Sequence, residues 1–142
     1  MTAVRRSAPI PAPPAAVMAV LLDVESYPSW QREVARVEVA ERDDAGRPVV
    51  ATTSIRALGR AGSYTVRYAY PSATELHYHL VAADMMSRHD AAFTVSARES
   101  GCELTVELDI ALKWPVPGPI VGTFMRKGVA DMLRAVKGRA EA

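Results

Sequence analysis

The stretch CELTVELDIALKWPVPGP, residues 102–119, decides the fold. From Cys102 to Lys113 apolar and polar residues alternate, which is the pattern of a long strand with one buried face. The prolines that follow end the strand, and apolar residues at helical spacing then run from Pro119 to Ala140. A helix of this length spans about 33 Å, so the sequence predicts one long helix that covers a whole sheet.

The segment from Glu33 to Ser100 predicts the rest of that sheet. Its runs of Val, Tyr, Thr and Ile are separated by short turn sequences at residues 43–46, 59–62, 71–73, 85–87 and 99–101. Strands joined by such short turns pair antiparallel. The clearest alternation lies in residues 63–70, where one face is formed by Tyr64, Val66, Tyr68 and Tyr70. We therefore expect one apolar and one solvated face.

The N-terminal part predicts a strand followed by two short helical segments. The strand covers Thr2–Ile10 and ends at the prolines after it. A short helix then carries apolar residues at helical spacing, and Pro28 ends it because proline disfavours helical geometry at Tyr27. Residues 27–30, Tyr-Pro-Ser-Trp, form a turn or a second short helix.

Composition narrows the class of protein. The chain has 142 residues, 49% of them hydrophobic, which fits one domain over residues 1–142. The formal charge is +1 and neither sign forms a long block, which argues against a nucleic-acid partner. A single cysteine excludes an internal disulfide, and no apolar run suits a secretory signal or a membrane span. We expect a cytoplasmic protein, monomer or homodimer, without stable membrane insertion.

Two local sequences carry a family resemblance: Asp23–Trp30, with its Tyr-Pro turn, and Trp114–Pro117 at the start of the last helix. Together with the order of strands and helices, they resemble the START-like helix-grip superfamily, in the branch described as polyketide cyclase/dehydrase and lipid-transport proteins. The resemblance covers essentially the whole chain. It implies an α+β helix-grip fold, in which a curved seven-stranded antiparallel sheet wraps around the C-terminal helix and encloses a hydrophobic cavity, with two short helices after the first strand.

The candidate ligand-binding residues lie on the apolar faces of that fold. A phenol offers apolar bulk with one hydrogen-bonding group, which suits a ligand with rings and a few oxygens. Methionine tolerates ligands of variable shape, and Gly128 on the same helix leaves space. The predicted ligand-binding set is Trp30, Tyr64, Tyr68, Tyr78, Phe93, Met125, Val129 and Met132. For each of them, ordinary core packing is the alternative role.

Other chemistry finds little support in the sequence. No nucleophile elbow, phosphate-binding loop or paired cysteine motif is present. Glu75, His77 and His79 alternate with apolar residues, so we expect them on the solvated face and predict no metal site. His89 lies near a predicted hairpin, where we expect exposure. The sequence therefore assigns no catalytic residue and no cofactor.

Fold and residues favour the binding or transport of a hydrophobic small molecule, such as a lipid, a quinone or a polyketide-like compound, without covalent chemistry. Two alternatives stay open. A polyketide aromatase/cyclase or dehydratase would need an arginine or a carboxylate beside the tyrosines. A protein-interaction module would have a vestigial cavity, filled by side chains, with its apolar surface outside. The fold alone cannot decide among them.

Overall fold

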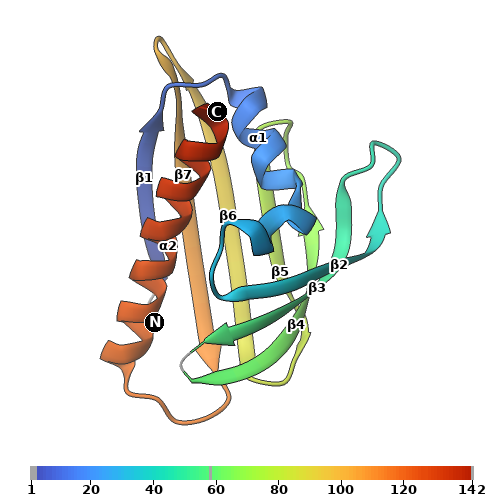
Figure 1. Cartoon of the computed structure of the whole chain (residues 1–142), viewed down its shortest axis with the longest axis vertical. Coiled ribbons are helices and arrows are strands. Elements are labelled where there is room, and N and C mark those ends of the chain that lie inside the picture. Colours follow the sequence, from blue (N-terminus) through green and yellow to red (C-terminus); the bar gives the residue numbers. More distant parts are fainter. Residues whose placement is uncertain (1–2, 58, 142) are drawn as a thin grey trace.

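The computed structural model describes residues 3–57 and 59–141, so Thr2 of the predicted first strand lies outside the described residues. In chain order the elements are β1 Val4–Ile10, α1 Pro14–Leu22, the 3₁₀ helix η1 Val24–Ser29, β2 Val34–Arg42, β3 Pro48–Ala57, β4 Arg60–Ala69, β5 Glu75–Ala83, β6 Met86–Arg98, β7 Gly101–Leu112 and α2 Gly118–Glu141. The predicted α+β fold is confirmed, with two short helical segments between the first two strands (Figure 1).

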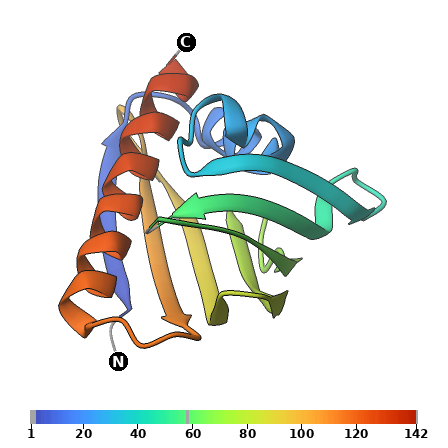
Figure 2. The same cartoon turned by 60° about the horizontal axis from the view of Figure 1, so that its bottom comes forward.

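The seven strands form one antiparallel sheet in the order β1-β7-β6-β5-β4-β3-β2. Strands β2 to β7 pair with their neighbours in sequence, whereas β1 pairs with β7, with Val4 opposite Leu108. The sheet is curved, and α2 lies along it in contact with β1 and β7 (Figures 1 and 2). The helix α1 contacts α2, β6 and β7, so it closes one end of the same side.

Helix α2 buries one stripe of side chains against the sheet. Met125, Val129 and Val136 are at most 1% exposed. Ile120, whose spacing places it on the same stripe, is instead 49% exposed. In Figure 1 the first turn of α2 lies beyond the N-terminal start of β1, and the first buried residue of the helix is Gly122. The apolar stripe therefore begins one turn later than its sequence pattern indicates.

A bulge in β5 lies at Val81. Val66 pairs with Leu80 and Thr65 with Ala82, which leaves Val81 without a partner in β4. Val81 is 54% exposed. Because the extra residue reverses the alternation beyond it, inward residues of β4 stay opposite inward residues of β5 on both sides of the bulge.

Strand β6 is longer than its turn sequence predicts. Residues 85–87 were expected to form a turn, but Met86 begins the strand, pairs with Leu112 and is 5% exposed. The register shifts between Met86 and Arg88, which turns the Met86 side chain into the core. Inward-facing positions of β6 therefore begin earlier in the chain than the sequence predicts.

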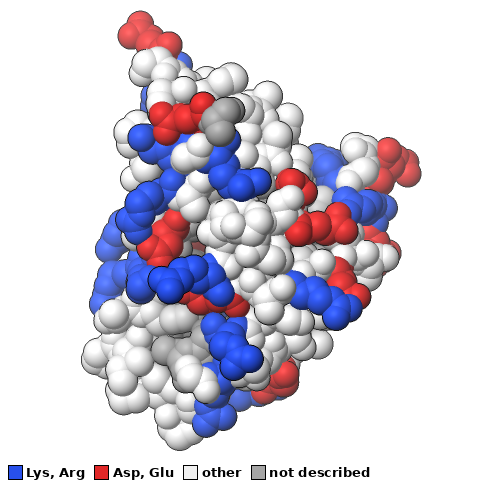
Figure 3. Space-filling model, in the orientation of Figure 1, with Lys and Arg blue, Asp and Glu red and all other residues white. Residues whose placement is uncertain are grey.

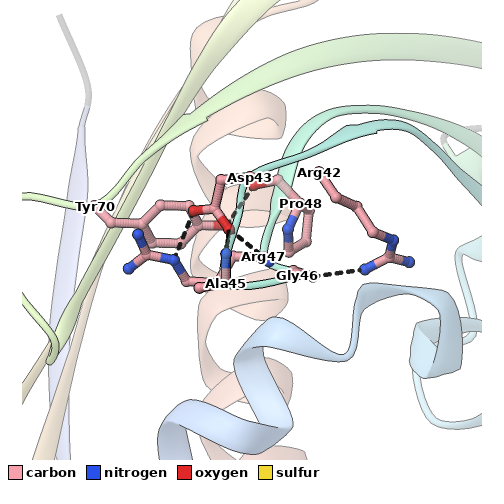
Figure 4. Close-up of polar contacts among 7 residues, drawn as sticks. All are labelled: Arg42, Asp43, Ala45, Gly46, Arg47, Pro48 and Tyr70. Atoms are coloured by element: carbon pink, nitrogen blue, oxygen red, sulfur yellow. Dashed lines mark hydrogen bonds and ion pairs between the residues drawn. The ribbon is translucent and has the colours of Figure 1, made fainter.

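Tyr70, which follows β4, packs against the β2–β3 turn. Its hydroxyl donates a hydrogen bond of 2.5 Å to the Pro48 carbonyl, and the Arg47 guanidinium lies 4.2 Å from its ring centre (Figure 4). The Asp43 carboxylate accepts bonds from the Ala45 and Arg47 backbone N–H groups and from the Arg47 side chain. Arg47 holds the pKa of Asp43 below its usual range, chiefly through its backbone hydrogen bond. This network positions the turn rather than a ligand.

Candidate functional site

A cavity of about 160 Å³ lies between the sheet, η1 and α2. Most of its lining is apolar. The lining residues are Val24, Tyr27, Gln31, Glu33, Val34, Val37, Thr53, Ile55, Tyr64, Val66, Tyr68, Tyr78, Met86, His89, Phe93, Val106, Leu108, Ile110, Phe124, Lys127, Gly128, Val129 and Met132. Six residues of the predicted ligand-binding set are among them: Tyr64, Tyr68, Tyr78, Phe93, Val129 and Met132.

Trp30 and Met125, the other two predicted residues, do not line the cavity. The Trp30 ring packs 4.8 Å from that of Tyr27, beneath the Arg139 guanidinium. Met125 is fully buried, and its Sδ accepts a hydrogen bond of 3.3 Å from the Ile110 N–H. Both residues pack behind the cavity and support the elements that form it, but their side chains are not part of its lining.

An aromatic wall forms one side of the cavity, and we define it as Tyr64, Tyr68, Tyr78 and Phe93. Tyr68 pairs with Tyr78 across β4 and β5, with ring centres 5.6 Å apart and edge to face. The Tyr78 ring centre lies 6.3 Å from that of Phe93. Both separations fall in the range where aromatic rings attract each other. The wall therefore offers ring faces and edges to a ligand.

The prediction that His89 is exposed is wrong. Its side chain lines the cavity and is 5% exposed. The Tyr78 hydroxyl lies 2.9 Å from Nε2 of His89, and the Tyr64 ring packs 4.5 Å from the imidazole. Nδ1 is buried without a hydrogen-bond partner in the part of the chain that the structure describes. The misplaced turn at residues 85–87 hid this residue, because counting back from Phe93 and Ala91 in steps of two along β6 reaches His89 on the inward face.

The ionisable groups within the aromatic wall and beside it are neutral near pH 7. Burial raises the pKa of Tyr64 to about 12 and raises that of Tyr78 well above its usual value. Burial also raises the pKa of Tyr68, with smaller contributions from Tyr64 and Tyr70. The pKa of His89 falls to about 4, because burial penalises the imidazolium. The cavity wall thus presents polar groups without net charge.

The tyrosine hydroxyls differ in what they already bind. Those of Tyr27 and Tyr70 donate to backbone carbonyls, and that of Tyr78 pairs with His89. The Tyr64 hydroxyl faces the Thr53 side chain, which offsets part of the rise in the Tyr64 pKa. Within the described residues, the Tyr68 hydroxyl makes no hydrogen bond. Tyr68 therefore presents a polar group that is still free for a ligand.

Polar and small residues form the rim of the cavity between α2 and the start of β2, namely Gln31, Glu33, Lys127 and Gly128. Gln31 Nε2 donates a hydrogen bond of 2.8 Å to Sδ of Met132, which joins the two sides. A Cβ atom at Gly128 would meet nothing within 4 Å, in keeping with the space expected there. Gln31, Glu33 and Tyr27 are site residues that sequence reasoning missed, and no local pattern marks them.

No group of three metal-ligating side chains forms among residues 3–57 and 59–141. Glu75 and His77 approach each other, with Nε2 and Oε2 3.6 Å apart, at a partly exposed position. None of the helices in the described ranges is long and apolar enough to span a membrane.

A long helix held by a curved sheet around an apolar cavity defines the helix-grip class of START-like proteins. Over residues 1–141 the chain matches the family described as "Polyketide cyclase / dehydrase and lipid transport", and it belongs to that family. The comparison with curated proteins found no match.

Solved structures share the fold. A START superfamily protein from Mycobacterium smegmatis has a TM-score of 0.90 at 24% identity, covering 99% of this chain and 98% of that one. The Zhui aromatase/cyclase from Streptomyces sp. R1128 has a TM-score of 0.80 at 19% identity, covering 98% of this chain and 93% of that one. A STAR-related lipid transfer protein from Xanthomonas axonopodis has a TM-score of 0.78 at 15% identity, covering 99% of this chain and 86% of that one. At these identities the likeness concerns the fold.

Proposed function

We propose that this protein binds and carries a neutral, hydrophobic small molecule in the cavity between its sheet and α2. One observation carries the proposal: an apolar cavity whose aromatic wall holds a free hydroxyl, that of Tyr68. In this arrangement the ring of the ligand packs on Tyr78 and Phe93 while Tyr68 fixes one oxygen. Within the ligand-binding set proposed from the sequence, Trp30 and Met125 act only by supporting the cavity.

The size of the cavity narrows the ligand class. An apolar cavity of about 150 Å³ holds benzene, and drug-sized ligands need about 300–1,000 Å³. A cavity of about 160 Å³ fits one substituted ring. A longer lipid or a multi-ring polyketide needs the rim to open, with separation of Gln31 from Met132. A compact aromatic or quinone-like head is therefore the part of the ligand that the cavity takes.

Binding without chemistry is favoured by the protonation states of the wall. A general base works best with a pKa near the working pH, whereas that of His89 is about 4. The tyrosines keep their protons, so they act as neutral hydrogen-bond donors. We place this function in the cytoplasm, where the buried thiol of Cys102 stays reduced.

Aromatase/cyclase chemistry is the second candidate function, and the Tyr78–His89 pair favours it because it places an imidazole beside a phenol inside the cavity. The carboxylate that such an activity would call for lies only at the rim, as Glu33. Incubation with a poly-β-ketone thioester tests this candidate. An aromatic product whose formation is lost in His89→Gln would establish catalysis in place of carriage.

Native mass spectrometry of the gently purified protein tests the main proposal, followed by denaturing extraction of anything released. A co-purifying compound with a compact ring would support it and give its chemical class. If the protein is empty, a thermal-shift panel of single-ring phenols, quinones and fatty acids decides the question. No shift with any of them would favour the protein-interaction alternative.

A further inference from the structure

The connection between β7 and α2 forms an exposed apolar end of the molecule. Pro115, Pro117 and Pro119 are exposed, and Ile120 is 49% exposed. Single exposed apolar residues are ordinary, but a run of them usually marks a contact surface. We define the apolar tip as residues 114–120, and Figure 3 shows the lower end of the molecule as largely uncharged.

Basic residues surround this tip. Residues 110–130 contain no Asp or Glu but include Lys113 and Arg126, and residues 45–74 contain no acid either. Lys127, further along α2, is paired with Asp131. The Arg60 guanidinium, from the start of β4, lies 4.5 Å from the centre of the Trp114 ring. Lys113 Nζ donates to the Ala83 carbonyl and forms no ion pair with an acid of the described residues. Asp84, next to Ala83, accepts hydrogen bonds from the Ser63 N–H.

We propose that the apolar tip docks on an anionic lipid bilayer. Ile120 and the prolines would enter the headgroup region, where tryptophan such as Trp114 is also stable. Arg60 and Lys113 would meet the anionic headgroups, and each basic residue near such a surface strengthens binding by about fivefold.

The three prolines favour a bilayer over an acidic protein as the partner. Proline has no N–H, so residues 115, 117 and 119 bring no backbone donor that would lose its hydrogen bond to water in the interface. The same property prevents the segment from adding a regular strand to the sheet edge of a protein partner.

The tip lies close to the cavity rim along α2. Phe124 and Lys127, which line the cavity, follow Ile120 by one and two turns, about 6 and 10 Å along the helix. Docking by the tip would thus bring the rim near the bilayer surface. The docking proposal does not depend on the ligand, because it rests on the tip alone.

Sedimentation with vesicles tests the proposal on the full chain. Vesicles of equal parts phosphatidylcholine and phosphatidylglycerol are expected to bind the protein, and phosphatidylcholine alone to bind it much less. Ile120→Ser and Arg60→Gln should each weaken binding by about fivefold.

Two variants control for hydrophobicity and charge. Val81→Ser removes the second large apolar side chain that is exposed among the described residues, on β5. Arg98→Gln removes a charge at the β6–β7 turn, at the opposite end of the molecule. Both should bind vesicles like the parent. Absence of binding to anionic vesicles would overturn the proposal, as would equal losses in the tip variants and the controls.

Discussion

The Tyr78 hydroxyl and Nε2 of His89 lie 2.9 Å apart inside the cavity wall. The position of one proton decides what this pair offers. With the proton on Nε2, the imidazole donates to the Tyr78 oxygen, and the phenol proton is free for a ligand. With the proton on Nδ1, Tyr78 donates to Nε2, and a buried N–H has no partner in the described part of the chain. The first tautomer leaves Nδ1 as an unpaired acceptor and frees the Tyr78 proton, so a ligand oxygen that accepts this proton favours it.

Tyr68→Phe should weaken binding of an oxygenated ring ligand by about 0.5–1.5 kcal/mol, because it removes one neutral hydrogen bond. Isothermal titration with a ligand identified by extraction measures the change. Tyr70→Phe is the matched control, since its hydroxyl binds Pro48 and does not line the cavity. Equal affinity of Tyr68→Phe and the parent would remove Tyr68 from the polar contact.

His89 should make stability fall in mild acid. Its pKa is about 4 in the folded protein and about 6.5 in the unfolded chain, so below pH 6.5 the unfolded state binds more protons. The free energy of unfolding should therefore lose about 3 kcal/mol between pH 6.5 and pH 4, and nothing from this group above pH 7.

Urea unfolding across this pH range measures the free energy of unfolding. Carboxylates also titrate in this range, and their contribution cancels when histidine variants are compared with the parent. His89→Gln should reduce the acid sensitivity, whereas His79→Gln, at an exposed position of β5, should keep it. Identical pH profiles for the parent and His89→Gln would contradict a buried neutral imidazole.

Two glycine substitutions should have opposite effects on stability. Gly128→Ala should raise the free energy of unfolding by up to about 1 kcal/mol, because alanine favours the helix and its Cβ meets nothing within 4 Å. Gly101→Ala should lower it, because φ is +140° and a Cβ would lie 2.2 Å from the Ile10 carbonyl oxygen. Thermal unfolding of both variants checks the contrast, and a stabilised Gly101→Ala would refute the strained geometry.

Gln31 and Met132 should control how fast a ligand leaves. Gln31→Ala removes the hydrogen bond across the rim, so we expect faster dissociation with a smaller change in the unfolding free energy. Stopped-flow displacement with a fluorescent ring ligand measures the rate. Gln31→Glu tests the donor itself, since a carboxylate cannot donate to Sδ. Unchanged rates in both variants would show that the rim opens elsewhere.

The aromatic wall was predictable because strand alternation is local. Tyr64 and Tyr68 follow from the period of two in β4, and Tyr78 from the same period in β5. The bulge at Val81 could have reversed this result, but it lies beyond Tyr78 in the chain. The helix-grip fold followed from the order of strands and the long last helix, which the structure confirms.

Other parts of the site depend on contacts that no local pattern contains. Met125 and Met132 lie two turns apart on one helical stripe, yet only Met132 lines the cavity. The distinction depends on how α2 sits against Ile110 and Gln31, which are distant in sequence. His89 was missed for a different reason, a misplaced strand boundary.

The pairing of β1 with β7 has a consequence for synthesis of the chain. Val4 leaves the ribosome well before its partner Leu108 and before the helix α2 that covers both. The hairpins from β2 to β6 can form while the chain is still growing, because their partners are adjacent in sequence. The first strand must wait, with its apolar residues uncovered, until β7 has emerged. A nascent chain stalled before Gly101 should therefore be sensitive to protease at its N-terminal strand, whereas a released chain should be protected there.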